Sequence, residues 1–204
     1  MTDPCLICMK PINDGLTWQG LLNLEKKKTL CADCSKRFVR ADIIEEGPVL
    51  DRVHSLYAYD DAMRDWLHQY KFLQDVALAD VFADELKKAL GGKDIIVPIP
   101  MHPERAVERT FSHVETLLDR AKRPYRQLLE KTTVSVMGEK SRQERLQMEP
   151  LFRLADTATI EPVTYLLVDD IYTTGTTLRQ AAELLKEAGA ERVEAVTLIR
   201  SIQN

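Results

Sequence analysis

One stretch near the C-terminal end of the chain constrains the fold more than any other. It joins a short apolar run, two adjacent aspartates, a loop of threonines around one glycine, and an amphipathic segment. The apolar run at 165–168 predicts a buried strand, and the apolar spacing at 177–188 predicts a helix that Gly189 ends. Ligands of parallel α/β sheets bind where a strand turns into the following helix. The stretch therefore predicts an α/β domain with a ligand site at residues 169–177.

The residue types in this stretch suit a phosphorylated sugar. The loop consists of Thr173, Thr174, Gly175, Thr176 and Thr177. Its hydroxyl and backbone N–H groups lie at a helix N-terminus, where the dipole favours a phosphate, and the glycine permits close approach. The carboxylates of Asp169 and Asp170 would repel a phosphate, but they can accept hydrogen bonds from paired ribose hydroxyls. The pattern predicts a ribose 5-phosphate site; the alternative is an ordinary strand, turn and helix with capping threonines.

Strands and helices alternate through the rest of the chain. We expect strands at 53–59, 94–100 and 192–199, and helices that begin at Asp60, Asp75 and Pro103, the last two reaching about residues 90 and 122. This order predicts a parallel α/β sheet flanked by helices. The charged, weakly periodic stretch 127–152 predicts a long loop with short flanking elements, a type that often forms a lid.

The N-terminal part of the chain has a different character. Residues 42–52 lose periodicity and contain Glu45-Glu46-Gly47-Pro48, so we expect a linker there, between a small module at 1–48 and the α/β domain at 49–204. All four cysteines lie in the module, as two Cys-x-x-Cys pairs: Cys5, Cys8, Cys31 and Cys34. Two such pairs can hold one tetrahedral Zn²⁺ in a closed, structural site. The alternative is a set of buried or redox-active cysteines.

Composition limits the range of functions. The net charge is −4 and the isoelectric point is near 5.7, which argues against nucleic-acid binding by the whole surface. Residues 100–145 carry ten Lys or Arg against seven Asp or Glu, so any contact with single-stranded DNA would be local. The sequence has no apolar run long enough to span a membrane and no signal-peptide pattern, so we expect a cytoplasmic protein.

Two resemblances sharpen these expectations. The segment from Val168 to Thr177 resembles the phosphoribosyl pyrophosphate (PRPP) motif of type I phosphoribosyltransferases, which implies that Asp169 and Asp170 bind ribose hydroxyls and that residues 173–177 bind the 5-phosphate. Nearly the whole chain resembles the ComF (ComFC) family of competence proteins. That resemblance rests on the cysteine pairs, Tyr70-Lys71-Phe72-x-x-Asp75, Val97-Pro98-Ile99-Pro100-Met101-His102-Pro103-x-Arg105, Gln143-x-x-Leu146 and the PRPP loop. Family members often have Arg-Gly-Phe-Asn where this chain has Arg109-Thr110-Phe111-Ser112.

The resemblances also imply a pyrophosphate site. Candidates are Lys71, Met101, His102, Arg105 and Arg109. For the two arginines, pairing with Glu104 and Glu108 on a solvated helix is an equal alternative. For Lys71 the equal alternative is an ordinary lysine at the end of an amphipathic helix. By the same resemblance, the loop from Lys131 to Leu146 would close over the pyrophosphate; a disordered charged loop is an equal alternative. Mg²⁺ would accompany PRPP. No residue is assigned as catalytic, and His102 and His113 are not expected to act as acid or base.

Three functions remain open at this point. The first, implied by the ComF resemblance, is a protein of DNA uptake that works in natural transformation beside a helicase-like ATPase, at the inner face of the membrane. The second is a phosphoribosyltransferase that acts on a nucleobase or an amine. The third is a sensor that binds PRPP without chemistry.

Overall fold

The computed structural model describes residues 3–12, 28–92, 95–101, 111–132 and 151–201. Its centre is a five-stranded sheet in the order β1-β2-β7-β6-β3. These strands are β1 (Arg40–Glu45), β2 (Arg52–Ala58), β3 (Ile95–Pro98), β6 (Thr164–Tyr172) and β7 (Arg192–Arg200). All neighbouring pairs are parallel except β1 with β2. The predicted parallel α/β sheet is confirmed, with one antiparallel strand added at its edge.

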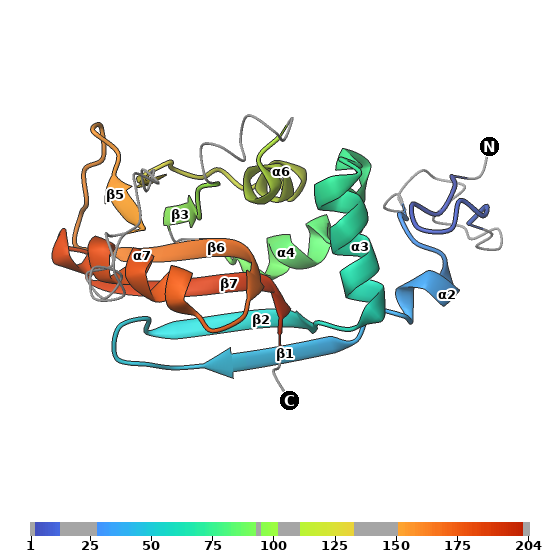
Figure 1. The fold of residues 1–204 in the computed structure, drawn as a ribbon, viewed down its shortest axis with the longest axis horizontal. Helices are drawn as coiled ribbons and strands as arrows, with labels where there is room; N and C mark the ends of the chain where they lie inside the picture. Colours follow the sequence, from blue (N-terminus) through green and yellow to red (C-terminus); the bar gives the residue numbers. More distant parts are fainter. Residues whose placement is uncertain (1–2, 13–27, 93–94, 102–110, 133–150, 202–204) are drawn as a thin grey trace, which may run out of the picture.

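Helices cover both faces of this sheet (Figure 1). One face carries α3 (Asp61–Phe72), the 3₁₀ helix η1 (Val76–Val81), α4 (Ala83–Ala89) and α6 (His113–Arg120). The other carries α7 (Thr176–Glu187) and a separate antiparallel pair, β4 (Leu129–Lys131) and β5 (Phe152–Leu154). Along β6, Leu166 and Val168 pack into the first core while Tyr165 and Leu167 pack into the second. This alternation buries the strand on both sides and explains its continuous apolar run.

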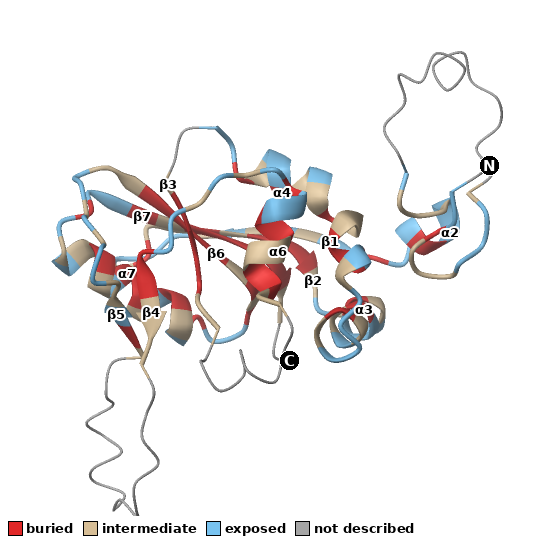
Figure 2. Cartoon of the chain, turned by 90° about the horizontal axis from the view of Figure 1, so that it is seen from above, coloured by how far each residue is buried: buried red, intermediate tan, exposed pale blue. Residues whose placement is uncertain are grey.

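The N-terminal module lies at one end of the molecule, beside α3 and far from the β4–β5 pair (Figures 1 and 2). It contains the short helix α2 (Ala32–Ser35). Leu6, Ile7 and Leu30 pack against the core under α3 and α6. Because these apolar contacts cross from the module to the main core, unfolding of the module would also expose part of that core.

Several predicted elements have different limits in the structure. Asp60 caps α3 by accepting a hydrogen bond from the Met63 amide at 2.8 Å, as expected. The single helix predicted at 75–90 is instead η1 followed by α4, because Phe82, buried among the rings of Phe38, Tyr57 and Trp66, leaves helical geometry. The helix predicted from Pro103 is described only from His113, and residues 102–110 lie outside the described residues.

The predicted linker at 42–52 is wrong for its first four residues. Residues 40–45 form β1, which pairs with β2 and continues the central sheet. Alternating exposed and half-buried positions, together with a bulge between Arg40 and Ile43, hid this strand from the apolar pattern. The division of the chain at residue 48 stays a prediction. Among the described residues, no helix is long and apolar enough to cross a membrane.

Candidate phosphoribosyl and metal sites

The candidate ligand site is a cavity at the carboxyl ends of β3 and β6. It has a volume of about 280 Å³ and is lined by Lys71, Ile99, Pro100, Met101, Ser112, His113, Val114, Lys131, Asp169, Asp170 and Thr177. The structure thus brings five of the predicted site residues together from α3, β6, α7 and the segment after β3. His102, Arg105 and Arg109 lie outside the described residues, so their proposed contacts with pyrophosphate remain predictions.

The two aspartates lie within β6 rather than after it. The strand continues to Tyr172, and Asp169 is paired with Thr197 of β7. The Asp170 amide donates a hydrogen bond to the Asp169 carboxylate at 2.8 Å. Burial, and then the charge of Asp170, raise the pKa of the Asp169 carboxyl to about 7. Near neutral pH this carboxyl therefore exchanges readily between a form that donates a hydrogen bond and a form that only accepts one.

A lysine from α3 neutralises the second aspartate. The Lys71 ammonium lies 2.5 Å from the Asp170 carboxylate, and the two side chains are 16% and 8% exposed. Lys131, at the end of β4, lines the same cavity and also favours ionisation of Asp169. The cavity therefore combines two carboxylates with two ammonium groups, which suits a ligand that carries both hydroxyls and phosphates.

The threonine loop leads from β6 into α7. Gly175 occupies the N-cap position with φ 75°, a left-handed conformation that favours glycine. No side chain caps the helix there, and the first N–H groups of a helix have no partners within it. The hydroxyls of Thr174 and Thr176 lie 3.0 Å apart. The start of α7 thus has the local geometry of an anion site.

Three polar residues that line the cavity were not among the predicted site residues. Ser112 and His113 lie at the start of α6, and Lys131 ends a three-residue strand. His113 is not expected from the sequence to act as an acid or base, and its buried ring lies against those of Tyr70 and Phe111. The available signal for Lys131 is its place two residues after the apolar pair Leu128-Leu129, since the end of a strand often lies at a site.

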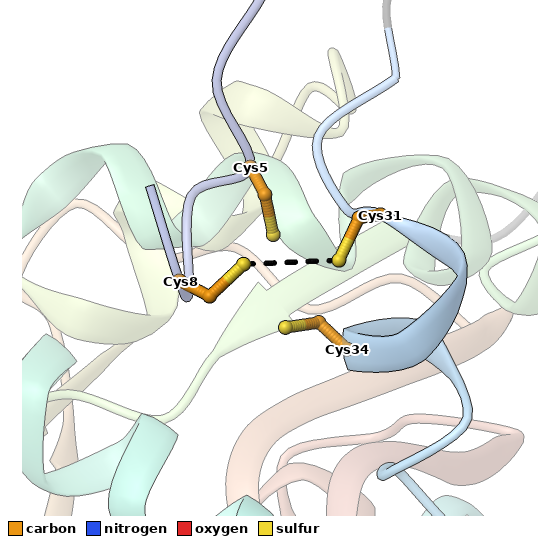
Figure 3. A group of neighbouring side chains, drawn as sticks. All are labelled: Cys5, Cys8, Cys31 and Cys34. Carbon is orange, nitrogen blue, oxygen red and sulfur yellow. Dashed lines mark hydrogen bonds between the residues drawn. The ribbon is translucent and has the colours of Figure 1, made fainter. Parts of the chain in front are cut away.

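The four cysteines converge at the second site (Figure 3). Their ligand atoms lie within 4.8 Å of one another, and the sulfurs of Cys8 and Cys31 are 3.8 Å apart. A tetrahedron with metal–sulfur bonds of about 2.3 Å has sulfur–sulfur edges of about 3.8 Å. The four thiols therefore fit one zinc ion, and two of them, Cys5 and Cys34, are buried.

Comparison with known proteins agrees with this architecture. Residues 76–204 match the family model of the phosphoribosyl transferase domain. The chain is 34% identical to "Competence protein ComFC" of Streptococcus pneumoniae (strain ATCC BAA-255 / R6) over 96% of this chain and 99% of that protein. It is 28% identical to "Competence protein ComFC" of Bacillus subtilis (strain 168), over 97% and 95% of the two chains.

Solved structures give a weaker likeness. A hypoxanthine phosphoribosyltransferase from Staphylococcus aureus aligns at 17% identity and a TM-score of 0.36, over 65% of this chain and 73% of that one. The sheet, the loop and the family match define a protein with a phosphoribosyltransferase domain. Within that class, the chain belongs to the ComFC family of competence proteins.

Proposed function

We propose that this chain is a competence protein of natural transformation whose cavity binds PRPP or a nucleotide phosphate. The observation that carries the proposal is the joint placement around one cavity of the Asp169–Asp170 pair and of Thr177, in the first turn of α7. The chain that contains it is similar to ComFC proteins over nearly its full length. In this proposal the ribose hydroxyls meet the aspartates and the 5-phosphate meets residues 173–177.

Lys71 and Lys131 would face the anionic part of the ligand. Lys71 is already paired with Asp170, so its charge is available to a ligand only to the extent that ribose hydroxyls take over hydrogen bonds to this carboxylate. Lys131 forms no ion pair with an aspartate among the described residues and lies near the Phe152 ring, with its ammonium 5.8 Å from the ring centre. We therefore expect Lys131 to be the cation that moves toward a phosphate. Mg²⁺ would arrive bound to the pyrophosphate of PRPP and would help to neutralise it.

The cysteine cluster is proposed to hold a structural zinc ion. All four ligands are thiolates, so no coordination position stays open for catalysis. The metal would fix the N-terminal module against the core through Leu6, Ile7 and Leu30. We propose that this module presents a rigid docking face to a helicase-like ATPase on the cytoplasmic side of the membrane.

Contact with single-stranded DNA is proposed to be weak and local. The basic stretch from Arg105 to Arg145 would supply three or four cationic contacts with phosphates; five of its ten Lys and Arg residues lie outside the described residues. Affinity should then fall with salt with a slope of about −0.7 per contact. Binding that does not respond to salt would exclude this mode.

Deletion of the gene tests the proposed role in the cell. Uptake of transforming DNA should fall, while growth on purines and pyrimidines stays normal. Complementation with the unaltered gene should restore uptake, and complementation with Asp169→Ala/Asp170→Ala should not. A salvage defect with intact transformation would instead support the second candidate, a phosphoribosyltransferase for a nucleobase or amine, which the family match to residues 76–204 favours.

Turnover separates that enzyme from a non-catalytic PRPP sensor. In the enzyme, the bond from C1 of the ribose to pyrophosphate breaks, a nitrogen nucleophile bonds to C1, and pyrophosphate leaves. A panel of nucleobases and amines added to the PRPP complex would reveal this as release of pyrophosphate. Binding of PRPP without release for any of them would support the sensor or the accessory role.

A further inference from the structure

Two arginines donate hydrogen bonds to backbone carbonyl groups of the threonine loop, residues 173–177. Arg179, in the first turns of α7, donates a hydrogen bond from Nη2 to the carbonyl oxygen of Thr174 at 2.6 Å. Arg200, the last residue of β7, donates from Nη1 to the neighbouring carbonyl oxygen of Thr173 at 3.4 Å. Neither side chain lines the cavity that contains Asp169 and Asp170. Both therefore act on the backbone of the loop from outside the ligand site.

The geometry of the peptide group makes this position significant. Among the described residues all peptide bonds are trans, and in a planar trans peptide the C=O points opposite to the N–H of the next residue. When the carbonyl of Thr173 faces Arg200, the N–H of Thr174 must face away from it. The carbonyl of Thr174 and the N–H of Gly175 stand in the same relation to Arg179. The two guanidinium groups thus fix the direction of two consecutive N–H groups in the loop.

Arg200 is itself held on two sides. Its Nη2 lies 2.5 Å from the carboxylate of Glu45, the last residue of β1. Its guanidinium lies 4.1 Å from the ring centre of Tyr172, its register partner on β6. The Arg200 side chain is 18% exposed. An ion pair on one side and a ring on the other leave this side chain little rotational freedom.

Gly175 is packed tightly against two neighbouring side chains. A Cβ at that position would lie 2.4 Å from the Tyr172 hydroxyl and 2.8 Å from Nη1 of Arg179. The space beside Gly175 is therefore already filled by Tyr172 and by Arg179, which also binds the Thr174 carbonyl. A backbone packed this way cannot easily rotate its peptide planes, because rotation would break a hydrogen bond or meet Tyr172.

We propose that Arg179 and Arg200 are positioning residues that turn the Thr174 and Gly175 N–H groups toward the ligand phosphate, and that Glu45 fixes Arg200 in this task. The proposal rests on the proposed binding of a 5-phosphate by residues 173–177. The proposal gives β1, at the edge of the sheet, a role in the site. This strand supplies the Glu45 carboxylate, which holds Arg200, and Arg200 in turn orients the loop.

The Glu45→Gln variant distinguishes two possible roles of Arg200 by the direction in which it changes anion affinity. If Arg200 attracted the phosphate directly, removal of the nearby negative charge in Glu45→Gln would strengthen anion binding. If Arg200 acts by orienting the loop, the same change frees its guanidinium and weakens binding. Glu194→Gln is the matched control. Glu194 forms an ion pair with Arg192 at 2.8 Å, and both residues lie on β7, the strand that ends at Arg200.

The experiment titrates ribose 5-phosphate into the full chain by calorimetry and records amide NMR shifts of the unliganded protein. Arg179→Met and Arg200→Met should each weaken binding about tenfold, as expected for loss of a hydrogen bond from a charged donor. Glu45→Gln should weaken it by a smaller factor. Arg192→Met and Glu194→Gln should bind as the wild type does. The amide signals of Thr174 and Gly175 should move in the first two variants and stay in place in both controls.

Two results would overturn the proposal. One is unchanged affinity and unmoved Thr174 and Gly175 amides in both arginine variants. The other is tighter binding by Glu45→Gln. This variant should keep the native fold, because the Glu45 side chain is 41% exposed. If the wild type binds no ribose 5-phosphate at all, the proposed function fails, and the amide shifts of the unliganded variants still decide whether the arginines orient the loop.

Discussion

The Lys71 ammonium lies 2.5 Å from the Asp170 carboxylate, so a residue of α3 and a residue of β6, far apart in the sequence, share one largely buried ion pair. The pair links the helical layer to the strand that carries the proposed ribose site. It also holds the Asp170 side chain in place before any ligand binds.

This ion pair should be visible in a double-mutant cycle. Lys71→Met leaves the Asp170 carboxylate without its counter-charge, and we expect a loss of about 2 kcal/mol in the free energy of unfolding. Asp170→Asn should cost a similar amount, and the double variant should cost less than the sum by about 1–2 kcal/mol. Urea denaturation measures all three. Simple additivity would mean that the two groups do not interact in solution.

Gly175 should tolerate no side chain. Gly175→Ala combines a left-handed φ of 75° with a contact of 2.4 Å to the hydroxyl of the buried Tyr172. Gly91→Ala is the matched control, since Gly91 has φ 59° but no atom of the described residues lies within 4 Å of the added Cβ. We expect the control to lose about 1 kcal/mol of stability from backbone strain alone, and Gly175→Ala to lose more and to stop binding ribose 5-phosphate. Equal losses in thermal denaturation would show that close packing behind the loop is unimportant.

Asp169 should make stability depend on pH. Its pKa is raised from 3.8 to about 7 by burial and by Asp170, so folding favours the neutral carboxyl. The stabilising contribution is fully present below about pH 4, where the carboxyl is also neutral in the unfolded chain, and is lost as the pH rises through about 7.

Asp169→Asn isolates this effect, because the amide oxygen can still accept the Asp170 N–H. The variant should match the wild type near pH 4, gain stability relative to it as the pH rises to 7, and hold a constant advantage above that. Denaturation curves at several pH values provide the comparison. A difference that does not change between pH 4 and 8 would place the titration elsewhere.

Removal of zinc should destabilise the main core as well as the N-terminal module. We expect about one zinc ion per chain in protein isolated without chelator, and a lower melting temperature after chelation because Leu6, Ile7 and Leu30 pack on the main core. Restored zinc should restore the melting temperature, and Cys8→Ser should lower both metal content and stability. Metal content far below one per chain, measured by elemental analysis, would refute the assignment.

The sequence predicted best where a local pattern carries the chemistry. The apolar run before Asp169 and the helix after Gly175 are confirmed because a buried parallel strand and an amphipathic helix each have a strong periodicity. The apolar run predicts a strand end at Val168, four residues short of Tyr172, because the charged Asp169 and Asp170 interrupt the apolar pattern. The cysteine spacing likewise predicted a cluster that the structure confirms.

The remaining features depend on contacts between distant segments. β1 is half-exposed and contains charges at Arg40, Asp42 and Glu45, so only its pairing with β2 identifies it as a strand. The sequence supports a ligand contact and an ordinary helix end equally for Lys71. Its partner Asp170 becomes its neighbour only through the packing of α3 on the sheet. The same holds for Arg200, whose contacts come from β1 and from the loop after β6.

The measurement that tests the account most directly is calorimetric titration of the purified chain with PRPP and Mg²⁺. The wild type should bind, and Asp169→Ala/Asp170→Ala should bind at least tenfold more weakly, a difference of about 1.4 kcal/mol, because hydrogen bonds from ribose hydroxyls to two carboxylates are lost. Circular dichroism should confirm that the double variant is folded. Unchanged affinity in that folded variant, or no binding by the wild type, would contradict the assignment of the phosphoribosyl site.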